Sequence, residues 1–213
     1  MKKILTLSLS FLFFICAEAQ QQILLLTETF ETGSNIFEYD SGGVGTNTGT
    51  NEWIINSLYD GQSLYPNTPP QDSIVSGQIN NAPFSRYLHI HDSGAAGGVA
   101  NANWNTANAS DRFTFIKSPF CTLGMTDVLF TFFWISEGNT DAYGEVYYRI
   151  DGGPWTKTGQ AKYNNQSKWK YEVIQDPAFE NAQNLQLGFR WVNPSPGGAA
   201  NVALNLLQLG AKP

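Results

Sequence analysis

Apolar and polar residues alternate with a period of two along several short stretches of this chain. Residues 144–150 and 185–192 alternate in this way, which is typical of a strand with one face in a core and the other toward solvent. Residues 128–135 are apolar on both faces and only Thr131 breaks the pattern, so this segment is expected in the middle of a sheet. Further strands are expected at residues 23–30, 53–55, 87–91, 113–117, 169–173 and 202–209.

The segments between the expected strands have the composition of loops. Residues 40–51, 56–85 and 94–111 are rich in glycine, asparagine or proline and show no apolar periodicity. No segment longer than two turns has helical periodicity, and residues 177–184 allow one short turn. About nine or ten strands without alternating helices predict an all-β fold, an antiparallel β-sandwich of the jelly-roll kind.

The N-terminus has the features of a secretory signal peptide. Basic residues 2–3 precede an apolar run, and Ala-Glu-Ala at 17–19 is an A-x-A site, so cleavage is expected near Ala19. The apolar run is too short to span a membrane. We therefore expect residues 1–19 to be removed and residues 20–213 to form a single secreted or cell-surface domain without a transmembrane segment.

The composition is acidic and aromatic. The formal net charge is −6 and no basic run occurs, so nucleic acids and anionic membranes are poor partners. Cleavage would leave Cys121 as the single cysteine, which cannot form an internal disulfide and, beside Phe120 and Leu123, is expected to be buried. Aromatic residues make up 14% of the chain, the same share as charged residues, which indicates either a very aromatic core or rings that bind a ligand.

A series of aromatic motifs resembles a known kind of domain. The motifs are FE at 30–31, YLHI at 87–90, FFW at 132–134, YGEVYYRIDGGPW at 143–155, YNNQSKW at 163–169 and LQLGFRWVN at 185–193. Their order is similar to that of jelly-roll modules in secreted and surface proteins of Bacteroidetes, often cargo of the type 9 secretion system. These modules share their layout with the MAM and cleaved-adhesin domains, which are concanavalin A-like or galactose-binding-like sandwiches. The resemblance covers nearly all of the mature chain and implies the fold rather than a particular ligand.

The same resemblance implies a calcium site between the N-terminal FE motif and the closing strand. On this sequence the ligands would be Glu31 and Asn205, with Asp92 as a third oxygen ligand. The relatives usually have an acidic residue where Asn205 stands, so weaker binding is expected. They also commonly continue into a sorting domain beyond the position of Pro213, so this chain is expected to stand alone, to use another export route or to be part of a longer protein.

The sequence gives less support to a zinc site or to a catalytic site. His89 and His91 share one face of a strand beside Asp92, as zinc ligands can, but no cysteine or further histidine is available to complete the site. Four acidic residues crowd the central unit: Glu137, Asp141, Glu145 and Asp151. No E-x-D-x-x-E motif of a glycosidase and no G-x-S-x-G elbow accompanies them. The chain is therefore not expected to be an enzyme, and no catalytic residue is assigned.

Polar side chains on the wet faces of two strands form the candidate ligand site. Tyr147 and Arg149 project from one strand and Arg190 from another, and Tyr143 and Trp155 flank them. If these strands are neighbours, the rings and guanidinium groups provide the contacts of a sugar or peptide platform. The alternative is that the arginines pair with acids such as Glu145, which is ordinary across antiparallel strands.

These observations favour a secreted, non-catalytic module that binds a ligand at the cell surface, with a glycan as the first hypothesis. The second hypothesis is an adhesin or a protein-interaction module of an envelope, secretion or gliding-motility assembly. The third is an accessory domain of a larger secreted hydrolase. Since jelly rolls carry many functions, the residues of the site must decide among the three.

Overall fold

The computed structural model describes residues 21–32, 35–39, 43–57, 79, 85–92, 94, 108–136, 141–194 and 202–213, with the backbone alone at 202, 203, 205 and 206. The expected signal peptide and most of the long segments 56–85 and 94–111 lie outside these residues. The described residues form eleven strands and one short 3-10 turn. They are β1 (Ile23–Glu28), β2 (Phe37–Tyr39), β3 (Asn51–Asn56), β4 (Tyr87–Asp92), β5 (Ser110–Ile116), β6 (Thr126–Ser136), β7 (Tyr143–Ile150), β8 (Thr156–Tyr163), β9 (Gln166–Gln175), η1 (Pro177–Phe179), β10 (Leu185–Asn193) and β11 (Val202–Lys212).

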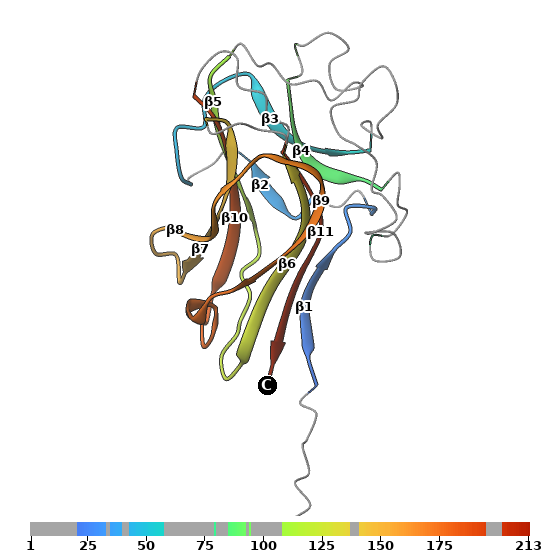
Figure 1. Ribbon diagram of the computed structural model, residues 1–213. Helices are drawn as coiled ribbons and strands as arrows, with labels where there is room; N and C mark the ends of the chain where they lie inside the picture. Colours follow the sequence, from blue (N-terminus) through green and yellow to red (C-terminus); the bar gives the residue numbers. More distant parts are fainter. Residues whose placement is uncertain are drawn as a thin grey trace, which may run out of the picture.

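The strands form two facing antiparallel sheets (Figure 1). The first sheet has six strands in the order β3-β4-β11-β6-β9, and β1 also pairs with β11; the second has five, in the order β2-β5-β10-β7-β8. The chain crosses between the sheets from β4 to β5, from β5 to β6 and from β6 to β7, which is the wrapping of a jelly roll. The prediction of an antiparallel β-sandwich is confirmed.

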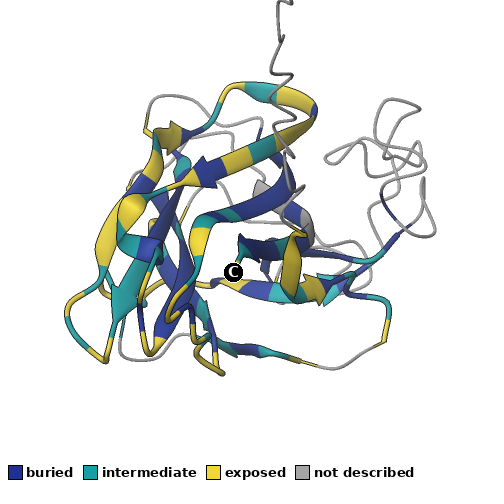
Figure 2. Ribbon diagram, turned by 90° about the horizontal axis from the view of Figure 1, so that it is seen from below, coloured by how far each residue is buried: buried dark blue, intermediate teal, exposed yellow. Residues whose placement is uncertain are grey.

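The core lies between the two sheets and is built from period-two side chains. In the first sheet, β6 lies between β11 and β9, as its two apolar faces predict. Its Phe130 and Phe132 are fully buried and approach Phe189 of β10 with ring centroids 5.9 and 5.7 Å apart. Figure 2 shows buried positions alternating with more exposed ones along the outer strands. Large aromatic rings therefore supply much of the apolar surface that stabilises the sandwich.

The alternation in β7 fixes which side chains face outward. Val146 is buried in the core, and Tyr148 and Ile150 pack against it. Tyr147 and Arg149 consequently project from the opposite face, which is the outer face of the second sheet. The sequence pattern alone predicts this orientation.

Two features of the fold differ from the expectations. The short strand β2 pairs with β5 in a segment where no strand was expected. Cys121 is exposed rather than buried, because the buried position of this turn belongs to Thr122, whose hydroxyl donates to the Phe179 carbonyl at 2.6 Å. Within the described residues, no helix is long and apolar enough to cross a membrane.

Candidate functional site

The residues predicted to bind a ligand lie on the outer face of the second sheet. Strands β7 and β10 are neighbours, and their register places Glu145 opposite Arg190 and Arg149 opposite Gln186. Trp155, just before β8, packs over the same face, with its ring 4.9 Å from that of Phe113. The structure therefore brings most of the predicted residues together.

Arg190 uses its guanidinium group in contacts within the protein. Its Nε and Nη2 donate to the two carboxylate oxygens of Asp111 at 2.7 and 2.8 Å, and its Nη1 donates to Glu145 at 3.1 Å. Glu145 also accepts from Lys157 at 2.6 Å and from the Tyr147 hydroxyl at 2.7 Å. These charges compensate one another, so the alternative expectation of cross-strand pairing holds for Arg190.

The protonation states agree with this network. Burial alone would raise the pKa of Asp111, but the hydrogen bonds from Arg190 and Thr46 outweigh it and the pKa lies below its ordinary value. For Glu145, burial is likewise outweighed by Lys157 and Tyr147, and its pKa is lowered. Burial, followed by the hydrogen bond to Glu145, raises the pKa of Tyr147 to about 12, so this phenol remains a donor at neutral pH.

Arg149 is held differently, by rings and an amide. Its guanidinium carbon lies 4.6 Å from the ring centroid of Trp155 and 5.1 Å from that of Phe115, which are cation-π distances. Its Nε donates to Gln186 Oε1 at 2.8 Å. Gly188 makes room for this ring cluster, since a Cβ there would lie 2.5 Å from the Phe113 ring.

Tyr143 stands at the opposite end of β7 from Arg149, where Lys162 Nζ lies 4.1 Å above its ring. Each predicted ligand residue thus contacts a neighbour through a ring or a charged group, although Trp155 Nε1 has no hydrogen-bond partner among the described residues. Ion pairs and closely packed rings occupy the described part of this face, and a binding role for these residues stays a prediction.

Two of the residues expected to bind calcium, Glu31 and Asp92, lie apart. Glu31 accepts a hydrogen bond from the Arg86 amide at 2.7 Å, just before β4, whereas Asp92 ends β4 and accepts from the Gly94 amide at 2.8 Å. Since a strand of this length separates the two carboxylates by roughly 17 Å, one ion cannot contact both. The side chain of Asn205 lies outside the described part of the chain. Asp92 therefore does not complete a site at Glu31, and calcium binding by Glu31 with Asn205 stays a prediction.

The two histidines share a face of β4, with ring centroids 6.4 Å apart, but both are buried. The ring nitrogens of His89 lie 3.1 Å from the Ile90 carbonyl oxygen and 2.8 Å from Asn56 Oδ1. Burial lowers the pKa of His89 to about 3, so the imidazole is neutral at physiological pH. No group of three metal-binding side chains occurs within the described ranges. Hydrogen bonds hold the His89 ring, whereas His91 Nδ1 has no hydrogen-bond partner among the described residues.

Two of the acidic residues of the central unit, Glu145 and Asp151, have partners within the protein. Glu145 is engaged by Lys157, Tyr147 and Arg190. Asp151 lies in the turn after β7 and accepts from Asn184 at 3.0 Å. Glu137 lies outside the described residues.

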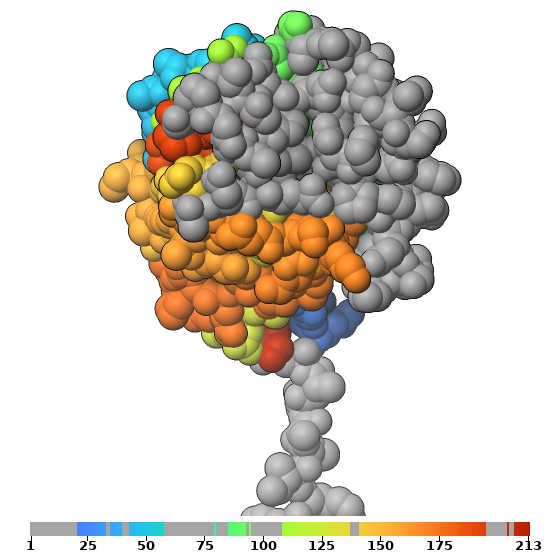
Figure 3. Space-filling model, turned by 45° about the horizontal axis from the view of Figure 1, so that its top comes forward, coloured from blue at the N-terminus to red at the C-terminus, as the bar shows by residue number. Residues whose placement is uncertain are grey.

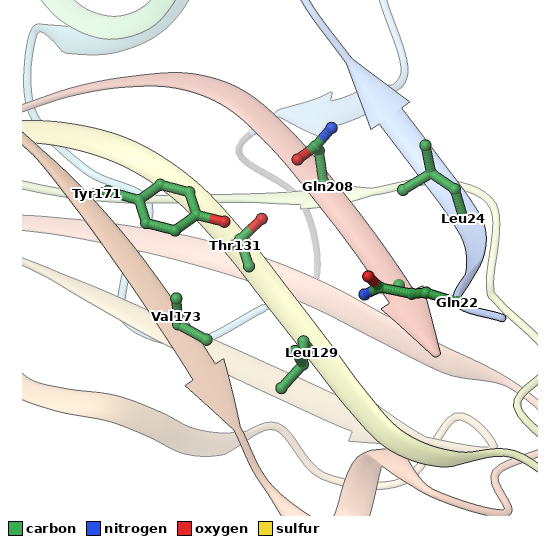
Figure 4. Close-up of a pocket in the computed structure, with 8 residues that line it drawn as sticks. Gln22, Leu24, Leu129, Thr131, Tyr171, Val173 and Gln208 are labelled. Atoms are coloured by element: carbon green, nitrogen blue, oxygen red, sulfur yellow. The ribbon is translucent and has the colours of Figure 1, made fainter. Parts of the chain in front are cut away.

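A groove that the sequence reasoning missed lies on the outer face of the first sheet (Figure 4). Its volume is about 380 Å³, within the usual size range of small-ligand sites. It crosses four neighbouring strands, β1, β11, β6 and β9. The lining residues are Gln22, Leu24, Leu129, Thr131, Tyr171, Val173, Gln208 and Gly210. None of them carries a charge.

Strand register explains how these residues come together. Thr131 pairs with Gln208 of β11 on one side and with Val173 of β9 on the other. One step along, Gly210 pairs with both Leu24 and Leu129. Because residues two apart on a strand share a face, the two rows form one continuous surface.

The floor of the groove contains an unsatisfied polar group. Thr131 is 8% exposed, and its hydroxyl has no hydrogen-bond partner among the described residues. Buried polar groups normally have partners, and one without is an unusual feature that calls for an explanation. The signal was present in the sequence, since Thr131 is the one polar residue in the apolar run of β6.

The apolar side chains at the ends of the groove are unusually exposed. Leu24 is 57% exposed at the β1 end, and Tyr171 and Val173 are 44% and 49% exposed on β9. Figure 3 shows β8 and β9, in orange, across the surface of the molecule, with β1, in blue, at its lower edge. An exposed ring beside apolar groups and amide side chains is a surface that can stack on a ligand and hydrogen-bond to it.

No family model and no curated protein matches the chain. Solved structures with a similar β-sandwich include the K3 cleaved adhesin domain of Lys-gingipain from Porphyromonas gingivalis, at 14% identity and a TM-score of 0.47 over 89% of this chain and 99% of that one. The carbohydrate-binding module CBM27-1 of Caldicellulosiruptor saccharolyticus, solved with mannohexaose, matches at 13% identity and a TM-score of 0.45, over 88% of this chain and 96% of that one. The CBM22-1 xylan-binding domain of Paenibacillus barcinonensis Xyn10C matches at 13% identity and a TM-score of 0.42, over 91% of this chain and 97% of that one. The similarity concerns the fold.

Proposed function

We propose that this chain is a secreted, non-catalytic carbohydrate-binding module and that the groove of the first sheet is its binding site. The observation that carries the proposal is the buried Thr131 hydroxyl without a partner, on the floor of an uncharged groove with an exposed tyrosine at one end. A sugar hydroxyl that displaced the side chains covering this nearly solvent-inaccessible oxygen would satisfy it. Sugar rings also present apolar C–H faces, which suit Tyr171, Leu24 and Val173.

The chemistry of the lining supports binding rather than catalysis. Glycoside hydrolysis requires a pair of carboxyl groups beside the scissile bond, and the lining contains no acidic residue. Gln22 and Gln208 provide amide donors and acceptors that match hydroxyl groups. Gln22 lies against Gly210, and a Cβ at position 210 would be 2.4 Å from Gln22 Nε2. The lack of a side chain at Gly210 therefore leaves room for the Gln22 amide.

A panel of soluble neutral polysaccharides, titrated calorimetrically into residues 20–213, tests the proposal. We expect at least one polysaccharide to bind and Tyr171→Ala to reduce its affinity about tenfold or more, the loss of one aromatic contact. The matched control is Tyr143→Ala, on the second sheet, which should leave binding unchanged. Binding lost in Tyr143→Ala and kept in Tyr171→Ala would place the ligand on the second sheet, and binding of no glycan would contradict the function.

A further inference from the structure

We infer that the groove holds an internal stretch of an uncharged, extended glycan chain that enters over one edge of the first sheet and leaves over the other. The inference rests on the proposed function and specifies how the ligand is held. Internal and terminal recognition differ structurally, because recognition of a chain end needs a closed wall at one end of the site. The position of the groove in the sheet distinguishes the two.

The groove runs from one lateral edge of the sheet to the other. At this level the order of strands is β1-β11-β6-β9, and β1 and β9 are the outermost described strands of the sheet here. Three strand spacings correspond to about 14 Å, which is longer than a single sugar ring. A ligand that spans the groove is therefore a chain of linked sugars.

Both ends of the groove are open. Leu24 on β1 and Val173 on β9 are about half exposed, at 57% and 49%, and Tyr171 beside Val173 is 44% exposed. Figure 4 shows Leu24 and Gln22 at one side of the groove, Tyr171 and Val173 at the other, and Thr131 between them. Among the described residues, neither end carries a charged or buried wall that would bind a chain terminus.

The surrounding charges favour a neutral chain. No lining residue is charged. The groove continues past Leu129 and Gln22 into a shallower hollow that contains Lys212 and Asp127, but these two form an ion pair at 2.8 Å. With a formal net charge of −6 on the chain, an acidic polysaccharide would be repelled and would find no unpaired cation among the residues that line either hollow.

The test measures affinity as a function of chain length, using neutral oligosaccharides from the disaccharide upward, derived from a polysaccharide that binds. Affinity should rise more than tenfold from the shortest to the longest member and then level off. Blocking either end of the longest oligosaccharide, by reduction or by methylation of the terminal sugar, should change its affinity less than twofold. Equal affinity for the disaccharide and the polysaccharide, or loss of binding after end-blocking, would overturn the inference.

Edge variants give an independent result. Leu24→Ser and Val173→Ser should each weaken polysaccharide binding severalfold. Leu24→Ser should leave disaccharide binding almost unchanged, because a disaccharide that stacks on Tyr171 at the β9 end does not reach β1. Leu123→Ser is the matched control, with a side chain 55% exposed and outside the groove, and it should leave both unchanged. If both edge variants weaken disaccharide binding as much as polysaccharide binding, the inference that a glycan chain passes through the groove is wrong. The proposal that the groove binds a glycan would still hold. If no glycan binds and an extended apolar peptide does, both proposals fail.

Discussion

The two outer faces of the sandwich differ in how their polar groups are satisfied. On the second sheet, the carboxylates of Asp111 and Glu145 and the guanidinium group of Arg190 bind one another. On the first sheet, the Thr131 hydroxyl is buried with no partner among the described residues. The charged face looks more like a binding site in the sequence, but its charged groups already pair with one another. The Trp155 ring N–H on that face also has no hydrogen-bond partner among the described residues, so what distinguishes the first sheet is the uncharged groove over its unpartnered group. A polar group without an internal partner beneath such a groove is the better indicator of a ligand.

The largest expected effect comes from breaking the ion network of the second sheet. Arg190→Met should lower the free energy of unfolding by about 3 kcal/mol, because two partly buried carboxylates lose their shared cation. Chemical denaturation of residues 20–213 measures the change. Lys212→Ala removes the cation of an exposed pair and should have little effect. Equal effects of the two substitutions would mean that the network contributes no more than a surface ion pair.

The buried histidines predict a second, pH-dependent loss of stability. Burial lowers the pKa of His89 to about 3 and also lowers the pKa of His91. Below pH of about 6.5 the unfolded histidines bind protons that the folded ones do not. Stability is therefore complete above that pH and falls as the pH decreases, by about 1.4 kcal/mol per pH unit for each group that is protonated only when unfolded.

Denaturation curves between about pH 7 and pH 5 measure this effect. Burial raises the pKa of Glu28, so a histidine variant is needed to separate the contribution of the histidines from that of this carboxyl group. His89→Gln should flatten the pH dependence. A variant with the same pH slope as the wild type would show that His89 does not titrate differently in the folded state.

The sequence predicts the fold well because the fold depends on local alternation. The pairs Val146 with Tyr147 and Phe189 with Arg190 occupy opposite faces of their strands, as period-two patterning requires. The central position of β6 follows from its two apolar faces. The short strand β2 was not expected, since three residues are too few to show a period.

The candidate site could not be predicted in the same way. The groove joins Leu24, Thr131, Val173 and Gln208 from four strands, and their proximity depends on a register that includes bulges in β1 and β11. No short sequence motif predicts that register. The separation of Glu31 from Asp92 has a related cause, because resemblance in motif order does not establish that two residues lie close together in space.

A smaller effect sharpens the contrast between the two faces. Thr131→Val replaces a buried hydroxyl that has no partner with a methyl group of similar size, so stability should stay equal or rise by about 1 kcal/mol. Thermal and chemical denaturation measure this change. A loss of more than about 1 kcal/mol would show that the hydroxyl has a stabilising partner after all.

The smallest expected effect is on the salt dependence of binding. Since the groove is uncharged, raising NaCl from about 0.05 M to about 0.5 M should change the affinity for a neutral glycan less than twofold, because salt screens only charged contacts. A strong decrease would indicate that charged residues such as Arg149 hold the ligand.

The most direct test is a titration of one neutral oligosaccharide into the wild type, Thr131→Val and Arg149→Gln. If the groove is the site, Thr131→Val binds about tenfold more weakly, corresponding to the loss of one hydrogen bond, and Arg149→Gln binds like the wild type. If Arg149→Gln loses affinity and Thr131→Val keeps it, the ligand lies on the second sheet and the assignment of the groove is wrong.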